Sequence, residues 1–301
     1  MAAQPTIKQL KYLCAVAEHR HFGRAAEARH VSQSALSAAI LELEQLLDVR
    51  LVERNSKGVL PTPVGEDVVL RARQLLTDLD DLVASSHRLR SPFTGNLRMG
   101  VIPTIAPFIL PHLLTLLREQ HPEFKLFIRE DLSANLVALL HHGELDVLLL
   151  ALPYDAENVH TRVLFADPLL LVFQPDDPLA TVKNLKTTAL KSRELLLLEE
   201  GHCLRDHAMA SCQLSNNDVS IPYQATSLNT VVQMAANNIG ITLLPQMAVT
   251  ADLLGNTSLS TRAFDQKGIE RDIGLMWRKK SPLQEQFTAL GDFIAANCQN
   301  P

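Results

Sequence analysis

The N-terminal part of the chain carries apolar side chains at helical spacing, interrupted by polar turns. Apolar residues recur every three or four positions over 7–19, and an alanine-rich segment covers 22–30, so we expect two helices there. Ser32 is a typical N-cap residue, which predicts a third helix over Gln33–Leu47. Two extended pieces around a central Asn-Ser-Lys-Gly sequence predict a β-hairpin over 50–63. Together these elements are typical of a winged helix-turn-helix.

A different pattern follows the hairpin. Apolar residues at helical spacing continue over 63–90, which predicts one long helix whose apolar stripe needs a partner. Ser-Pro-Phe-Thr-Gly at 91–95 ends it and is the expected hinge. Strands and helices then alternate to the C-terminus, which predicts an α/β fold with mainly parallel sheets. The chain leaves a first α/β unit near Asp167 and returns to it near Arg271.

These patterns predict three parts. They are a winged helix-turn-helix domain over 5–62, a linker and dimerisation helix over 63–90, and a regulatory domain over 91–301. Within the regulatory domain we expect α/β subdomain I over 95–166 plus 270–301 and subdomain II over 167–269.

Composition limits the class of protein. The chain has 301 residues, of which 47% are hydrophobic and 20% charged, as in a globular protein with a sizeable core. Four cysteines at irregular spacing do not form a secreted disulfide framework, and neither a signal peptide nor a membrane-length apolar run is evident. We therefore expect a cytoplasmic protein that does not enter a membrane, in a compartment where a disulfide is more often a signal than a structural link.

Charge modifies this picture slightly. The net charge is −5, which by itself argues against nucleic acid as a partner. Residues 1–65, however, contain eight Lys and Arg against six Asp and Glu, whereas the remainder contains 20 against 27. The N-terminal part is thus mildly basic.

The helix-turn-helix between Phe22 and Leu41 suits double-stranded DNA as a partner. Its second helix would enter the major groove, and the first turn offers small polar side chains that can reach base edges and phosphates. Any single cation nearby is more often a solvated surface charge, so only the whole pattern indicates DNA. The candidate DNA-binding residues are Ser32, Gln33, Ser34, Ser37, Arg24, Arg29, Arg54 and Lys57.

The segment 201–212, GHCLRDHAMASC, is the most unusual in the chain. Cys203 stands at an expected helix start with Arg205 two residues on, and both features favour a thiolate. If 204–211 is helical, Cys203 and Cys212 are separated by roughly 13 Å along the axis, whereas a disulfide requires Cα atoms within about 7 Å. The two cysteines could then join only if the helix unwinds, which is a property of a redox switch.

Two other interpretations of this segment stay open at this point. Both cysteines could be small buried apolar residues, as cysteine often is. A zinc site is a third interpretation, but the spacing of the histidines and cysteines does not match paired zinc ligands, so we expect no metal. Cys14 falls on the apolar face of its helix and is expected in the core, and Cys298 suggests nothing beyond packing or exposure to solvent.

The sequence from Ala25 to Glu66, AAEARHVSQSALSAAILELEQLLDVRLVERNSKGVLPTPVGE, resembles the winged helix-turn-helix of LysR-type transcriptional regulators. This chain departs from the family by Ser34 in place of the usual Pro and by the lack of Lys or Arg in 33–47. The resemblance implies a linker helix that dimerises, a regulatory domain of two linked α/β subdomains like a periplasmic binding protein, and a homotetramer arranged as a dimer of dimers.

GHCLRDHAMASC, together with VIPT at 101–104, resembles the peroxide-sensing branch of this family, the OxyR regulators. The resemblance implies that hydrogen peroxide oxidises Cys203 and that Cys212 resolves the product into a reversible intramolecular disulfide. It also implies an activator of antioxidant genes that works with RNA polymerase and is reset by a thiol reductant. No cofactor and no enzymatic activity are expected.

The same resemblance suggests supporting residues. Thr104 would offer a hydroxyl to peroxide, although the sequence alone favours a role as the N-cap of the following helix. Ser133 stands where the family usually has Thr and retains a hydroxyl. Of the supporting residues, His202 and Arg205 would hold the thiolate, and Asp206 would pair with Arg205. The full supporting set is Thr104, Ser133, His202, Arg205, Asp206 and Arg271.

Two functional alternatives remain. The first is a LysR-type regulator whose inter-subdomain cleft binds a small metabolite, with the cysteines incidental. The second is a thiol peroxidase that carries a DNA-binding fold. A regulator that needs no cysteine would still work after Cys203→Ser, and a peroxidase would turn over many equivalents of peroxide.

Overall fold

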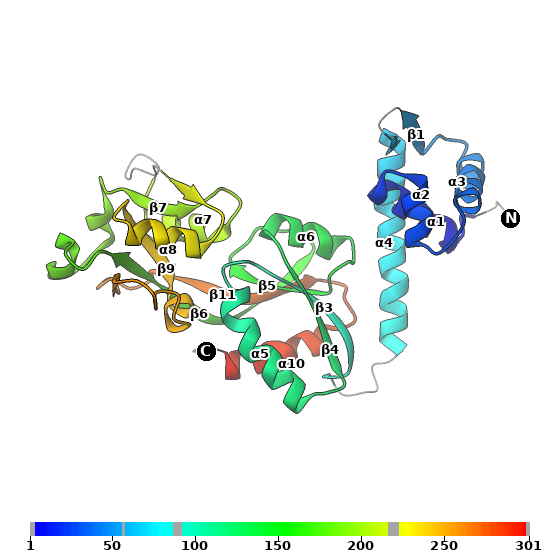
Figure 1. The fold of residues 1–301 in the computed structure, drawn as a ribbon. Coiled ribbons are helices and arrows are strands. Elements are labelled where there is room, and N and C mark those ends of the chain that lie inside the picture. The colour runs from blue at the N-terminus through cyan, green and yellow to red at the C-terminus, as the bar shows by residue number, and fades with distance from the viewer. Residues whose placement is uncertain (1–3, 56–57, 87–91, 216–222, 299–301) are drawn as a thin grey trace. The chain divides into compact units, whose positions relative to one another are not determined.

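The computed structural model describes residues 4–55, 58–86, 92–215 and 223–298. The chain divides into two compact units, one containing the N-terminal part through the long helix and the other most of the remaining chain (Figure 1). None of the described helices combines the length and apolar character needed to cross a bilayer.

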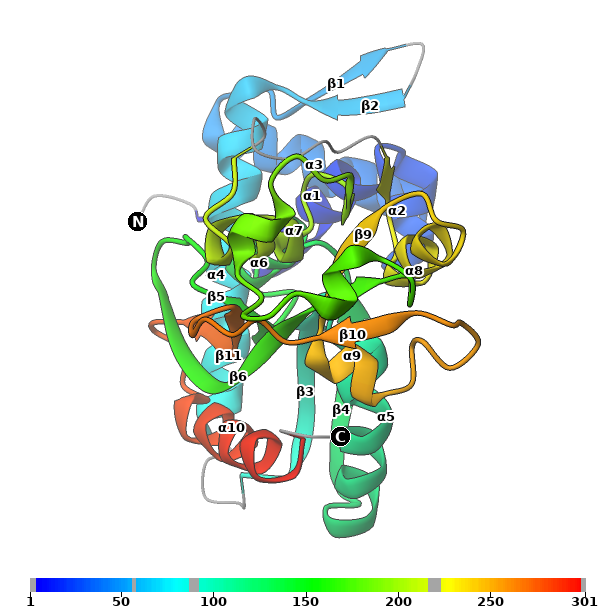
Figure 2. The same cartoon turned by 90° about the vertical axis from the view of Figure 1, so that its left-hand side faces the viewer.

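The N-terminal unit has the predicted winged helix-turn-helix and long helix, and its hairpin is clearest in Figure 2. Its elements are α1 (Ile7–His19), α2 (Phe22–Ala28), α3 (Gln33–Leu47), β1 (Val52–Asn55), β2 (Gly58–Pro61) and α4 (Pro63–Ser86).

Local interactions set the ends of these helices. Ser32 Oγ accepts a hydrogen bond from Ala35 N at 3.2 Å and so caps α3 as predicted. The second helix ends earlier than the expected 22–30, because His30 has a φ of 54°, which is not helical. Cys14 is buried, as expected from its position on α1.

The hairpin is joined to the third helix by a carboxylate. Glu44 Oε1 accepts hydrogen bonds from the backbone N of Leu51 at 2.7 Å and of Val52 at 3.2 Å. These bonds hold the start of the hairpin against α3. Along α4, Leu70 and Leu75 are exposed in the single chain. The predicted end of this helix near residue 90 lies outside the described residues.

The second unit is a mixed α/β structure. Its strands are β3 (Gly95–Val101), β4 (Phe124–Glu130), β5 (Val147–Leu152), β6 (Val159–Phe173), β7 (Leu195–Leu198), β8 (Gln224–Ala225), β9 (Ile241–Pro245), β10 (Ser260–Arg262) and β11 (Glu270–Arg278). Its helices are α5 (Ala106–Gln120), α6 (Ser133–His141), α7 (Cys203–Ser211), α8 (Leu228–Ala236), α9 (Gln246–Thr250) and α10 (Gln284–Asn297), with short 3₁₀ turns at Pro178–Thr181 and Thr187–Leu190.

The expectation of mainly parallel sheets is wrong. The described strands form one sheet in the order β4-β3-β5-β11-β6-β9-β7-β8, with β10 beside β6. Parallel pairings join β3 to β4 and β5, and β7 to β8 and β9, whereas every pairing made by β6 or β11 is antiparallel. The reason is that these two long strands cross from one half of the unit to the other in opposite directions.

The two halves have separate apolar cores. One core packs α5, α6 and α10 against β3, β5 and β11, and its buried β6 residue is Phe165. The other packs α8 and α9 against β7 and β9, and its β6 contributions begin at Leu169. The boundary between the two cores therefore crosses β6 between Phe165 and Leu169.

Candidate functional site

The two cysteines of the 201–212 segment lie at opposite ends of α7. Cys203 is the first residue of the helix, after the N-cap His202, and Cys212 is its C-cap. Cys203 packs in the core that contains β3 and β5, whereas Cys212 packs in the core that contains β7 and β9. All four cysteines are free thiols in this structure. The helix therefore holds the two sulfurs apart in different apolar surroundings.

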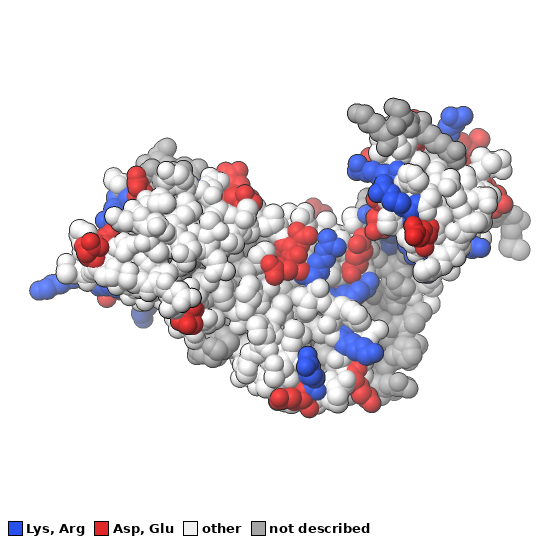
Figure 3. Space-filling view, in the orientation of Figure 1, with Lys and Arg blue, Asp and Glu red and all other residues white. Residues whose placement is uncertain are grey.

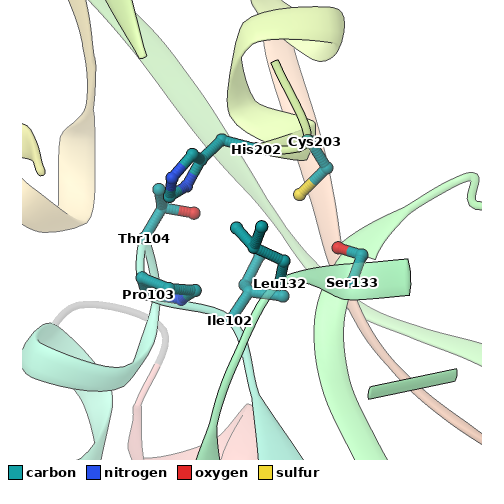
Figure 4. Close-up of a pocket in the computed structure, with 8 residues that line it drawn as sticks. Ile102, Pro103, Thr104, Leu132, Ser133, His202 and Cys203 are labelled. Carbon is teal, nitrogen blue, oxygen red and sulfur yellow. The ribbon is translucent and has the colours of Figure 1, made fainter. Parts of the chain in front are cut away.

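Cys203 borders a small recess where three segments meet (Figure 4). The recess has an empty volume of about 160 Å³, and its interior is narrower than a water molecule, so a ligand would enter with a small movement of the lining side chains. The segments are the loop after β3, the start of α6 and the turn before α7, which contribute Ile102, Pro103, Thr104, Leu132, Ser133, Gly201, His202 and Cys203.

The Ser133 hydroxyl is directed toward the Cys203 sulfur (Figure 4). Ser133 is 2% exposed, and its Oγ has no hydrogen bond of ordinary geometry within the described part of the chain. Its position near the sulfur nevertheless favours the thiolate. A buried hydroxyl left in this state can serve a small polar ligand in the recess.

A buried ion pair holds Thr104 on the other side of the recess. Arg271 Nη1 donates to Thr104 Oγ1, and Arg271 Nη2 donates to the Thr104 carbonyl oxygen, both at 2.9 Å. The same guanidinium pairs with Asp167 at 3.0 Å. Arg271 and Asp167 lie directly opposite each other on β11 and β6. The hydroxyl of Thr104 thus accepts one hydrogen bond and keeps its own proton to donate.

Burial dominates the electrostatics of Cys203. Desolvation raises the pKa of the Cys203 thiol, and the charge of Arg271, the Ser133 hydroxyl and the Ala151 backbone oppose that rise. The expectation that the helix start and adjacent cations favour the thiolate is therefore outweighed by burial. Burial also lowers the pKa of His202, so this imidazole at the edge of the recess favours its neutral form.

Cys212 is held more firmly as a thiol. It is 2% exposed, and burial alone raises its pKa to about 12. A thiol in this state neither attacks a sulfur nor binds a metal readily. No group of three or more His, Cys, Asp or Glu side chains able to hold a metal ion occurs within the described ranges.

Two expected supporting residues lie elsewhere. Arg205 points away from the recess into the second core, beside Leu204 and Thr242, and its ion pair is with Glu200 at 3.8 Å rather than with Asp206. Asp206 is exposed, and its charge raises the pKa of Cys203 instead of stabilising a thiolate. The expectation that Arg205 holds the thiolate fails because helix rotation places this side chain on another face of α7 from Cys203.

Three neighbours of the site were not predicted from the sequence. Asp167 is a lone acidic residue in an apolar strand, which is a signal that could have been noticed. Tyr154 lies near enough that Cys203 and Asp206, together with burial, raise its pKa. His207 stands one turn after Cys203, and burial and the charge of Arg271 lower its pKa.

In the N-terminal unit, the first turn of α3 is accessible. Ser32, Gln33 and Ser34 are exposed, Ser37 is half-buried, and a groove of about 580 Å³ between α3 and the hairpin is bordered by Leu41 and Arg50. On the face drawn in Figure 3, basic and acidic side chains are interspersed over both units. Arg24 and Arg29 are also exposed. The side chain of Arg54 and all of Lys57 lie outside the described residues.

Comparisons with known proteins agree with this organisation. Residues 90–299 match the model of the LysR substrate binding domain, and residues 7–66 match that of the bacterial regulatory helix-turn-helix protein, lysR family. The HTH-type transcriptional regulator EstR of Acinetobacter baylyi is 41% identical over 98% of this chain and 97% of its own. The hydrogen peroxide-inducible genes activator of Escherichia coli O6:H1 is 38% identical over 96% of this chain and 95% of its own.

A solved structure covers both units. Full-length OxyR from Pseudomonas aeruginosa, as a cysteine variant, matches with a TM-score of 0.81 and 30% identity over 99% of this chain and 97% of that chain. The matching family and these relatives are transcriptional regulators, which favours a regulator over the alternative of a thiol peroxidase. The chain belongs to the LysR family of bacterial transcriptional regulators, among relatives that include the OxyR proteins.

Proposed function

We propose that this protein is a transcriptional activator that senses hydrogen peroxide and is switched by a reversible Cys203–Cys212 disulfide. The observation that carries the proposal is the placement of the two thiols at opposite ends of α7, in different cores, with Cys203 at a recess that holds polar groups. The relationship to a peroxide-inducible activator supports the nature of the signal.

The recess provides what a reaction with peroxide requires. The Thr104 hydroxyl donates to one peroxide oxygen, and the Ser133 hydroxyl and neutral His202 lie on the same recess. The Cys203 thiolate attacks one oxygen, the O–O bond breaks, and the leaving hydroxide takes up a proton to become water. Cys203 becomes a sulfenic acid and the peroxide is reduced.

The second step requires a change of conformation. Cys212 then attacks the sulfur of the sulfenic acid, forming the S–S bond and releasing a second water. Cys212 follows Cys203 by nine residue steps, which in a helix is roughly 13 Å along the axis, beyond the roughly 7 Å limit for Cα atoms in a disulfide. We infer that α7 unwinds, which also removes Cys212 from its core and returns its pKa toward the ordinary value. A thiol reductant would reverse the bond.

The proposed switch would act by changing how the protein binds DNA. We propose that Gln33, Ser34 and Ser37 read bases or phosphates, aided by Ser32, Arg24, Arg29, Arg54 and Lys57 around the helix-turn-helix. The linker helix would pair two chains, since its exposed Leu70 and Leu75 suit an apolar interface. Rearrangement of the regulatory parts would then alter the spacing of half-sites read by a dimer of dimers.

We place the protein in the cytoplasm, with promoter DNA and RNA polymerase as partners and without a membrane association. The functional parts are proposed as 5–62 for DNA binding, 63–90 for dimerisation and 91–301 for sensing, the last divided into 95–166 plus 270–301 and 167–269.

A peroxide titration of the reduced, purified protein tests the proposal. Thiol labelling and mass spectrometry should show loss of two thiols and a Cys203–Cys212 bond near one equivalent of peroxide, reversed by a dithiol. Cys212→Ser should stop at the sulfenic acid, and Cys298→Ser, a matched control remote from α7 in sequence, should behave as the unaltered protein.

A metabolite-sensing LysR regulator is the second candidate, because EstR, a relative at 41% identity, has a name that does not refer to peroxide. If both thiols of α7 survive excess peroxide, and Cys203→Ser still regulates its promoter normally, the redox proposal is wrong. A small ligand of the regulatory part would then be sought by binding measurements.

A further inference from the structure

Asp167 belongs to the Cys203 site although it does not border the recess. Its Oδ2 accepts from Arg271 Nε at 3.0 Å, and its Oδ1 accepts from the backbone N of Met247 at 3.1 Å. Asp167 is 3% exposed and Arg271 is 1% exposed. The carboxylate is therefore fixed on both sides, on one by the strand opposite and on the other by the start of α9.

This carboxylate determines the orientation of the guanidinium. A buried arginine that lacks its carboxylate turns toward other acceptors, because an unpaired buried charge is costly. Here Asp167 Oδ2 lies 3.0 Å from both Nε and Nη2 of Arg271. In this orientation Nη1 donates to the Thr104 hydroxyl and Nη2 to the Thr104 carbonyl, both at 2.9 Å. The direction in which Thr104 offers its own proton thus depends on a residue of another strand.

We propose that Asp167 is a positioning residue that acts through Arg271 to keep the Thr104 hydroxyl directed into the recess, and so sets the selectivity of Cys203 for peroxide over other electrophiles. The inference rests on the proposed function, since peroxide is the ligand that the hydroxyl would serve. Peroxide needs a donor on its departing oxygen, whereas iodoacetamide, whose leaving group is iodide, needs the thiolate and no such donor.

The effect of the orientation of Arg271 can be separated experimentally from the effect of its charge on Cys203. The charged and titratable groups around Cys203 are Arg271 on β11, Asp206, His202 and His207 on or beside α7, and Tyr154 after β5. Asp167 faces this set only across the Arg271 side chain. Asp167→Asn redirects the N–H groups of Arg271 but leaves its charge beside Cys203, so it should change the pH profile of alkylation little while it disturbs the reaction with peroxide.

The experiment compares two rates on the full-length reduced protein, followed by mass spectrometry of the Cys203 peptide. For Asp167→Asn we expect the rate with hydrogen peroxide to fall roughly tenfold, a smaller loss than the roughly 10²- to 10³-fold cost of removing such a donor outright. The rate with iodoacetamide should stay within about twofold. Thr104→Val should show the same selective loss, and the double variant should react no more slowly than Thr104→Val alone.

The matched control is Asp146→Asn. Asp146 is another buried carboxylate paired with an arginine, Arg98, at 2.7 Å. It lies immediately before β5 and does not line the recess. Asp146→Asn should reduce stability without changing the ratio of the rate with peroxide to the rate with iodoacetamide. If Asp167→Asn does not fold, Asp167→Glu is the substitute, because it keeps the charge but moves the carboxylate. It should also lower the ratio of the rate with peroxide to the rate with iodoacetamide.

The outcomes separate the two proposals. An unaltered protein whose Cys203 does not react with peroxide would overturn the proposed function. A reactive protein in which Asp167→Asn leaves the ratio of rates unchanged, lowers both rates equally, or adds its full effect to that of Thr104→Val would overturn the positioning role alone.

Discussion

Cys203 and Cys212 are the first residue and the C-cap of one helix, yet their side chains belong to different apolar cores. The helix is therefore a spacer that keeps two thiols from meeting. Its stability controls the second step of the proposed switch, whereas the surroundings of Cys203 control the first. The two steps can be altered independently.

Weakening α7 should speed disulfide formation. Ala210 is exposed on this helix, and Ala210→Gly should destabilise it by about 1 kcal/mol, equal to roughly a fivefold shift toward the unwound state. Rapid quenching and mass spectrometry after a peroxide pulse should show faster conversion of the sulfenic acid and an unchanged first step. Ala296→Gly, at an exposed position of α10, is the control. Equal closure rates in both variants would contradict the role of α7 as the gate.

The reactivity of Cys203 should increase with pH. Because burial raises the pKa of its thiol, the thiol form predominates at neutral pH, and the thiolate fraction grows as pH approaches that raised value. The rate of Cys203 alkylation by iodoacetamide should therefore increase through the alkaline pH range without a plateau near pH 8. Ser133→Ala should shift the curve to higher pH, and Ser133→Thr should not. A plateau below neutrality would show that the thiolate is the resting form.

Cys212 should make reduced protein less stable in alkali. Its pKa is raised from 9.0 to about 12 in the folded chain, so between these values the unfolded state has released a proton that the folded state retains. Rising pH then favours unfolding. The thermal midpoint of the unaltered protein should fall more between pH 8.5 and 10.5 than that of Cys212→Ala. Parallel curves would mean that the thiol is not buried in solution.

DNA binding should depend on two kinds of side chain in different ways. Gln33→Ala should reduce preference for the specific site, because an amide at the start of α3 can hydrogen-bond to base edges. Arg29→Ala should weaken specific and non-specific binding together and reduce the slope of log affinity against log salt concentration by about one. Fluorescence anisotropy over a range of salt concentrations distinguishes the two. A salt slope unchanged by Arg29→Ala would remove Arg29 from the interface.

The linker helix should control assembly. Leu75 is 58% exposed on α4 in the single chain, so Leu75→Glu should cost little in folding but oppose an apolar interface. Analytical ultracentrifugation should show dissociation to smaller species, while Gln74→Glu, an exposed polar neighbour, should not dissociate. Retention of the full assembly in Leu75→Glu would place the dimer contact elsewhere.

Residues close together in the sequence determined much of the fold. The period of apolar positions and the Ser32 cap predicted α3 with both ends correct, and the central turn of the wing predicted its hairpin. The helix between Cys203 and Cys212 was predicted as well. Helices and hairpins depend on hydrogen bonds and side-chain contacts within a few residues, so a single sequence contains enough information to predict them.

Only the tertiary structure decided the composition and electrostatics of the site. Asp167 and Arg271 are 104 positions apart, and Arg271 and Thr104 are 167 apart. The strand order β3-β5-β11-β6 nevertheless places the loop after β3, which holds Thr104, near Arg271 and Asp167, and the three residues form one hydrogen-bonded chain. Burial decided the protonation of Cys203, and the rotation of α7 removed Arg205 from the recess. Desolvation and long-range pairing depend on which parts of the chain pack together, which local spacing does not contain.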